Sequence, residues 1–322
     1  MNDNPLYLME DFDFIPYDKS HKEEWDIFVD RSKNGTFLLK RDYMDYHSDR
    51  FQDYSFLIYK KNLLYALLPA CIFDDKIYSH AGLTYGGLVM NDKCITADIL
   101  QVFSKAIEIF RQQGYKTWLY KPVPEIYHDI PSQEDLYAIF RNNANLIVRN
   151  VSSVINLKKS LPFQKLRTRK IKKASLYSFD ISEEKDFNPF WQILEDNLRN
   201  KYNAKPVHSL LEIEGLAKKF PDNIKLFTTK KEGKTLAGVV CYIWKNTVHC
   251  QYITASPAGK ETGALDLLFN FLIKDYFSEM QYFDFGTSNE DGGKYLNQSL
   301  IFYKEGFGGR AVCYDTYLIP LS

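Results

Sequence analysis

The same order of predicted elements occurs twice in this chain, and this repetition limits the fold more than any other feature. Each half contains a hairpin, a further extended segment, an amphipathic helix and a short strand. The segments are 54–60, 63–71, 78–89, 96–113 and 116–120 in the first half, and 224–229, 236–244, 247–254, 265–276 and 282–285 in the second. Leu57 matches Leu226 at an offset of 169 residues, and Trp118 matches Asp284 at 166. We therefore predict an internal structural duplication, joined near residues 157–165.

The composition excludes several classes of protein. With 45% hydrophobic and 25% charged residues, the chain is neither disordered nor collagen-like. The 41 Lys and Arg residues are balanced by 41 Asp and Glu, which argues against a protein that coats nucleic acid non-specifically. This balance still leaves room for a local basic patch.

Cysteine usage and the apolar runs predict a cytoplasmic protein without a membrane span. The five cysteines are an odd number and include no CxxC pair, so we expect buried reduced thiols and no metal site. Residues 1–4 lack the basic start of a signal peptide. The best apolar run, 63–73, is too short to cross a bilayer.

A basic segment opens the second half. Residues 158–173 hold eight positive side chains and no acid: Lys158, Lys159, Lys165, Arg167, Arg169, Lys170, Lys172 and Lys173. Arg167 and Lys170 are candidates to bind the phosphates of a nucleotide-linked acceptor or of a tRNA acceptor end, because guanidinium and ammonium groups are phosphate ligands. The alternative is an exposed helix face whose charges are solvated.

Three short motifs carry a family resemblance. Residues 282–286 read Tyr-Phe-Asp-Phe-Gly, residues 302–308 read Phe-Tyr-Lys-Glu-Gly-Phe-Gly, and 166–174 is the basic stretch. Together with the element order over 20–319, they resemble the FemAB-like branch of the GNAT acyltransferases, which includes bacterial peptidoglycan bridge aminoacyltransferases. The resemblance implies an α/β (α+β) fold of two tandem GNAT-like domains, at 1–157 and 158–322, with mixed, mostly antiparallel sheets flanked by helices. The second domain would open with the basic helix.

The resemblance also raises the question of the acyl donor. GNAT enzymes hold the diphosphate of coenzyme A at a Gly-containing loop that opens the central helix. The matching loop here is 259–265, which makes Lys260, Gly263 and Ala264 candidate cofactor contacts. Leu265 stands at the last small position and Glu261 adds a like charge, whereas an aminoacyl-tRNA donor does not require this loop. Acyl-CoA and aminoacyl-tRNA both remain candidate donors.

Three residues near the C-terminus are the candidate catalytic groups. By resemblance, Lys304 would stabilise the negative charge that develops during acyl transfer; the alternative is a lysine whose stem packs on Phe302 or Phe307 with its head in water. Asp284, between two phenylalanines, would orient a substrate amine or serve as a structural hydrogen-bond acceptor. Tyr303 is a candidate to protonate a leaving group, as is Tyr314.

Two further segments carry weaker signals. Tyr85, Gly86 and Gly87 would line a substrate cleft, because glycines let a ligand approach the backbone; alternatively these glycines mark bulges in a bent strand. His249, between Val248 and Cys250, reads more readily as a core histidine than as a base.

The resemblance to the FemAB-like proteins implies a bacterial acyl- or aminoacyltransferase of cell-wall biogenesis. An amine of a small-molecule, cell-wall or nucleotide-sugar-type acceptor would attack the ester or thioester directly, so no covalent intermediate is needed. One alternative is an acyl-CoA-dependent N-acetyltransferase of a small amine. Another is a catalytically inactive GNAT-like module that binds a glycan precursor. The oligomeric state has no signature in the sequence.

Overall fold

The computed structural model describes residues 12–321, which form two compact units. The first unit runs to Arg149 and also contains the chain from Tyr314 onward, while the second spans Asn150–Cys313. The chain leaves the first unit within β9 (Asn145–Asn156) and returns to it within β17 (Arg310–Pro320). The division of the sequence at 157/158 concerns the join between the repeats and stays a prediction.

The first unit contains a four-stranded sheet in which the hairpin strands lie in the middle. Its elements are β1 (Phe12–Pro16), α1 (Lys22–Arg31), α2 (Arg41–Met44), β2 (Gln52–Asp53), β3 (Phe56–Lys60), β4 (Leu63–Leu68), β5 (Cys71–Phe73), β6 (Lys76–Tyr78), β7 (Val89–Met90), α3 (Thr96–Gln112), β8 (Thr117–Tyr120) and α4 (Glu134–Arg141). Strands β1, β3, β4 and β7 form an antiparallel sheet. Lys61 and Asn62 both have positive φ, as a two-residue hairpin turn requires. Helix α3 buries Phe103 and Phe110 against Trp118 of β8.

The predicted extended segment at 78–89 is present only at its two ends. Residues 79–88 form no strand, because this stretch folds along the end of β8. The amide of Ser79 donates to the carbonyl of Leu119, and the amide of Gly86 donates to the carbonyl of Lys121.

The second unit repeats the order of hairpin, strand, helix and strand. Its elements are α5 (Lys165–Ala174), β10 (Asp180–Glu184), α6 (Asn188–Tyr202), α7 (Leu210–Lys219), β11 (Ile224–Lys231), β12 (Lys234–Trp244), β13 (Thr247–Ala255), α8 (Pro257–Thr262), α9 (Ala264–Phe271), the π-helical segment η6 (Leu272–Tyr276), β14 (Tyr282–Thr287), β15 (Asn289–Glu290), β16 (Tyr295–Leu296) and α10 (Gln298–Glu305). Helix α6 begins at Asn188 and has Pro189 in its first turn, where the missing N–H of proline leaves no helical hydrogen bond unmade.

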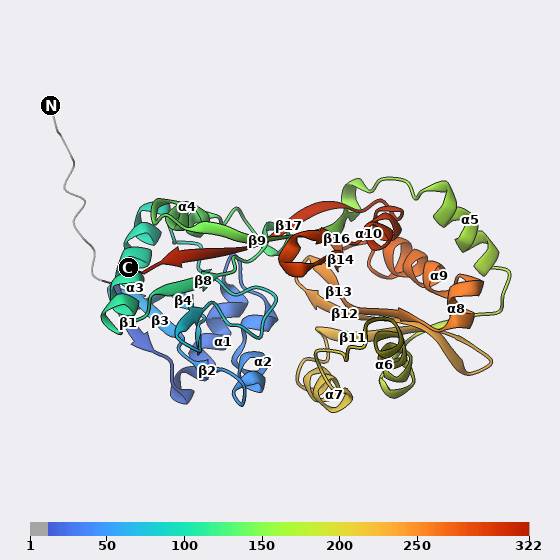
Figure 1. Cartoon of the computed structure of the whole chain (residues 1–322), viewed down its shortest axis with the longest axis horizontal. Helices are drawn as coiled ribbons and strands as arrows, with labels where there is room; N and C mark the ends of the chain where they lie inside the picture. Colours follow the sequence, from blue (N-terminus) through green and yellow to red (C-terminus); the bar gives the residue numbers. More distant parts are fainter. Residues whose placement is uncertain (1–11, 322) are drawn as a thin grey trace. The chain divides into compact units, whose positions relative to one another are not determined.

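The sheet of the second unit is antiparallel except at one position. From β10 to β13 each strand is antiparallel to the next, β13 and β14 run parallel, and β14 is antiparallel to the second half of β9. Helix α9 packs on the sheet beside α5, and α6 and α7 lie on the other side of it (Figure 1). Phe269 of α9 meets Phe283 and Phe285 of β14 in the core. The expected mixed, mostly antiparallel sheets flanked by helices are confirmed.

Between residues 12 and 321, no helix is both long enough and apolar enough to cross a membrane.

Candidate functional site

A buried lysine lies at the end of β14. The side chain of Asn297 accepts from the amide of Leu300 and so caps α10, and Lys304 lies in the last turn of this helix. Its Nζ donates to the carbonyl of Gly286 at 2.8 Å and to the carbonyl of Thr287 at 2.7 Å. The residue is 3% exposed, and this burial lowers its pKa to about 8 although the nearby charge of Asp284 opposes the shift. The head of Lys304 therefore does not lie in water, and the role of the residue in transfer stays a prediction.

Asp284 is the centre of a hydrogen-bonded cluster beside Lys304. Its carboxylate is fully buried and accepts from the amide of Gly286 at 2.9 Å, from the hydroxyl of Ser152 and from Nδ1 of His249 at 2.7 Å. A buried carboxylate needs such donors, because burial without them costs several kcal/mol. The structure thus places Asp284 near Lys304 and adds His249 to the same cluster.

The sequence did not indicate that His249 lies beside Asp284. The parallel pairing of β13 with β14 ends at His249 and Asp284, where the two strands separate. Two residues after His249, β13 bulges against β12 at Gln251, since Cys250 pairs with Cys241 and Tyr252 with Val240. The pairing of His249 with Asp284 follows from strand register, and only an alignment of the two strands would have revealed it.

Tyr303 belongs to a different cluster from Lys304. The guanidinium carbon of Arg167 lies 4.6 Å from the centre of the Tyr303 ring. Burial raises the pKa of Tyr303 well above its ordinary value, although the charge of Arg167 opposes this. The ring packs on Phe269 and Phe307. A role of Tyr303 as proton donor stays a prediction.

Arg167 is buried against the start of α9. Its Nη1 donates to Oδ1 of Asp266 at 2.6 Å, and the residue is 4% exposed. This corrects the view of the basic segment as one exposed face, because residue 167 turns inward on α5 while Lys170 stays in solvent. Burial raises the pKa of Asp266, and the charges of Arg167 and Lys170 oppose the shift. The two residues stay predicted substrate ligands, but only Lys170 is exposed.

The loop predicted to hold a cofactor is largely helical. Residues 257–262 form α8, and Gly263, with φ of +79°, joins it to α9. Nζ of Lys260 donates to Oδ1 of Asn197 at 3.0 Å, and Ala264 is fully buried. A Cβ at Gly263 would lie 3.2 Å from the carbonyl oxygen of Lys170, so α5 covers this glycine. Binding of a cofactor at Lys260, Gly263 and Ala264 stays a prediction.

Tyr85, Gly86 and Gly87 are buried in the first unit. The Tyr85 ring packs on Tyr127, with ring centres 5.0 Å apart. A Cβ at Gly86 would collide with the carbonyl oxygen of Ser79, and Gly87 has φ of +68°. These glycines therefore allow the backbone to pack closely on itself, and their contact with a substrate stays a prediction.

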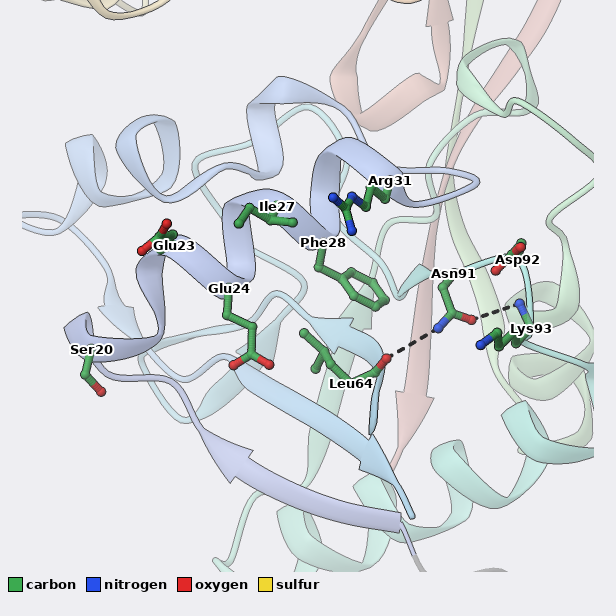
Figure 2. Close-up of a pocket in the computed structure, with 10 residues that line it drawn as sticks. All are labelled: Ser20, Glu23, Glu24, Ile27, Phe28, Arg31, Leu64, Asn91, Asp92 and Lys93. Atoms are coloured by element: carbon green, nitrogen blue, oxygen red, sulfur yellow. Dashed lines mark hydrogen bonds between the residues drawn. The ribbon is translucent and has the colours of Figure 1, made fainter. Parts of the chain in front are cut away.

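A surface hollow of about 660 Å³ lies elsewhere in the first unit. Phe28, Ile27 and Leu64 form its apolar part, and charged side chains of both signs surround it (Figure 2). None of the residues predicted from the sequence lines this hollow. Within 12–321 there is also no group of three or more His, Cys, Asp or Glu side chains that could hold a metal ion.

Comparisons with known proteins agree with this fold. Residues 164–304 match the family model of the acetyltransferase (GNAT) domain. FemX is similar in structure, with a TM-score of 0.70 and 10% identity over 96% of this chain and 97% of FemX. L-PGS from Bacillus licheniformis has a TM-score of 0.62 and 13% identity over 92% of this chain and 90% of that protein. A tandem GNAT protein from the clavulanic acid biosynthesis pathway has a TM-score of 0.51 and 9% identity over 97% and 99% of the two chains.

A comparison with curated proteins gave no match. At 9 to 13% identity the solved structures show the fold, and the family model places the acyltransferase domain at 164–304. Residues 164–304 are therefore similar to the acetyltransferase (GNAT) domain, and the chain as a whole shares the fold of FemX and of a tandem GNAT protein.

Proposed function

We propose that the chain transfers an aminoacyl group from an aminoacyl-tRNA to an amine of a cell-wall or nucleotide-sugar-type acceptor. The observation that carries the choice of donor is the buried pair of Arg167 and Asp266 at the start of α9. In a CoA-dependent GNAT enzyme, the amides and the dipole of this helix end attract the diphosphate.

Here an internal anion already lies at this helix end. Asp266 is in the first turn of α9, and its carboxylate is buried and paired with Arg167. Because Arg167 is already paired with Asp266, its charge is not free to bind a diphosphate at this place. Helix α5 also packs on α8 and α9, and the backbone of Lys170 covers Gly263. These contacts favour a donor that does not depend on a diphosphate loop.

The exposed side of α5 suits a polyanionic donor. Its remaining basic residues are exposed and form no ion pair with any residue in 12–321: Lys165, Arg169, Lys170, Lys172 and Lys173. Cations that neutralise successive phosphates gain affinity by releasing counterions. A tRNA acceptor end supplies such phosphates, while the small net charge of the whole chain limits non-specific binding.

The reaction would be direct attack of a neutral amine on the ester carbonyl. Lys304 supplies a buried positive charge for the developing oxyanion. The acceptor is proposed from the likeness to FemX, whose fold the chain shares.

A binding experiment separates the two donors. Aminoacyl-tRNA should bind the full chain, and acetyl-CoA or CoA should not raise its melting temperature, because only a ligand of the folded state does so. Replacing Lys170 and Lys173 by Ala should weaken tRNA binding and reduce the slope of log K against log salt by about 2. The matched control replaces Lys218 and Lys219, the exposed lysine pair at the end of α7, by Ala. Stabilisation by acetyl-CoA, or tRNA binding that is equal in both double variants, would contradict the proposal.

A further inference from the structure

His249 has one ring nitrogen bonded and the other available. Nδ1 lies 2.7 Å from Oδ2 of Asp284, and because a carboxylate can only accept, Nδ1 carries the proton of the neutral ring. No residue within 12–321 forms a hydrogen bond with Nε2. A histidine that serves only to fill a core would bury its whole ring, whereas this side chain is 15% exposed.

Gly286 leaves room beside the imidazole. A Cβ at this position would lie 3.3 Å from Cε1 of His249 and 3.9 Å from Nε2. Gly286 has φ of +76°, and its amide donates to Asp284 while its carbonyl accepts from Lys304. The same glycine therefore holds the carboxylate and the ammonium and keeps the ring edge uncovered.

From this geometry we propose that His249 is the general base of the transfer reaction and that Asp284 is its positioning residue. The inference rests on the proposed function, since a base is needed only if an amine attacks the ester. Asp284 holds the tautomer in which Nε2 has a lone pair and stabilises the imidazolium that forms, the arrangement found in hydrolytic triads.

The proton balance of the step is complete. The amine nitrogen forms a bond to the ester carbonyl carbon, and Nε2 of His249 takes the proton that the amine loses. The tetrahedral intermediate then breaks its bond to the ribose oxygen of the tRNA. This oxygen leaves with the electron pair and receives the proton from Nε2, so the imidazole is neutral again and no other reactant is consumed.

The groups around the ring are compatible with this role. Asp284 on β14 is the anion that faces His249. Lys304 on α10 lies close enough to Asp284 for the charge of the carboxylate to raise the pKa of the lysine. Lys304 donates to carbonyls and not to the carboxylate, so Asp284 remains an acceptor for Nδ1. Cys250, next along β13, is fully buried with a pKa well above its ordinary value, so it stays a thiol.

The first test needs no substrate. NMR of the full chain with ¹⁵N-labelled histidine at pH 8 should show a proton on Nδ1 of His249 and none on Nε2. Diethyl pyrocarbonate should then modify His249 at Nε2. The control is His128, whose Nε2 lies 2.9 Å from the carbonyl oxygen of Val123 and should react more slowly.

The second test uses aminoacyl-tRNA as donor and a UDP-linked muropeptide with a free amine as acceptor. His249→Asn keeps an N–H donor toward Asp284 but removes the base, so kcat should fall by about 100- to 10,000-fold with KM nearly unchanged. Added imidazole should restore part of the rate, which a purely structural role would not allow. His128→Asn is the matched control and should transfer at the wild-type rate.

The two tests fail in different ways. If the wild type transfers and His249→Asn is equally fast, the general base is overturned and the proposed function stands. If the wild type transfers nothing, the proposed function is overturned, and the proton on Nδ1 and the reactivity of Nε2 still decide whether a base is present. A proton on Nε2, or an unreactive His249, overturns the inference in either case.

Discussion

Replacing Lys304 by Met should change how the stability of the protein depends on pH. Burial lowers the pKa of Lys304 from 10.5 to about 8, whereas the same side chain in the unfolded chain keeps its ordinary value. Between these two values the unfolded chain holds more protons than the folded one. The free energy of unfolding therefore rises as the pH rises from about 8 to 10.5. This gain in stability is lost as the pH falls back through about 8. Methionine has a similar stem and no charge, so this dependence should disappear.

The magnitude follows from the two pKa values. Each pKa unit corresponds to about 1.4 kcal/mol, and the part of the window between pH 7.5 and 10 gives roughly 2 kcal/mol. Buried tyrosines and cysteines also titrate in this range, but they are present in both chains. Their contribution cancels in the difference between wild type and variant, except for that of Cys250, whose pKa the charge of Lys304 lowers.

The assay is urea denaturation of wild type and Lys304→Met at several pH values from 7.5 to 10. The stability of the wild type relative to the variant should rise by roughly 2 kcal/mol over this range. Lys173→Met, in an exposed position on α5, is the control and should leave the curves parallel. If wild type and Lys304→Met also run parallel to within about 0.5 kcal/mol, the ammonium is not desolvated as the structure shows.

The same charge predicts an effect on transfer. An ammonium that stabilises the oxyanion in a buried site contributes about 2–4 kcal/mol, so Lys304→Met should lower kcat by roughly two to three orders of magnitude with little change in donor affinity. The wild-type rate should also fall as pH rises above about 8, because Lys304 then loses its proton. A Lys304→Met variant with full activity would refute the assignment.

Three further predictions concern buried groups in both units. Arg167→Met should lower the free energy of unfolding by about 3–5 kcal/mol because it leaves a buried carboxylate unpaired, while Lys170→Ala, in solvent, should change it by less than about 0.5 kcal/mol; urea denaturation measures both. Gly286→Ala should reduce transfer more than Gly233→Ala, since both have φ of +76° but only the first would crowd His249; equal rates would count against the site. Burial raises the pKa of Asp135, in the first unit, from 3.8 to about 6. Because the folded chain then holds more protons than the unfolded one, the free energy of unfolding should fall as pH rises through this range, and Asp135→Asn should remove this fall in urea denaturation curves.

The elements that local sequence determines were predictable. The apolar segments 54–60 and 63–71 were predicted to form a hairpin, and Lys61 and Asn62 between them adopt the positive φ that its two-residue turn requires. The repeated order of elements also followed from such local signals. The stretch 79–88 was predicted wrongly as extended, because its course depends on contacts with β8 that lie far away in the sequence.

The site was predictable only in part, for the same physical reason. Lys304 was chosen by the family resemblance and Asp284 because it lies between two phenylalanines, and the structure places the two near each other. His249 also interrupts an apolar run, but its partner is decided by the register of two parallel strands. Likewise, eight cations in one segment look alike in the sequence, and only the packing of α5 on α9 shows that Arg167 is the buried one.

The second unit has two buried carboxylates with different surroundings. Asp266, at the start of α9, has a structural role, whereas Asp284, on β14, is suited to a role in catalysis. Asp266 is neutralised by the full charge of Arg167, so a second cation would stabilise it little. The pair connects α5 to the start of α9. Asp284 is held by an amide, a hydroxyl and an imidazole, while the nearby ammonium of Lys304 donates to carbonyls. A carboxylate bound by neutral donors gains most when one of them becomes charged, and the imidazole is the one that can. A proton taken up by His249 is therefore stabilised by Asp284 in a way that Asp266, already paired, could not provide.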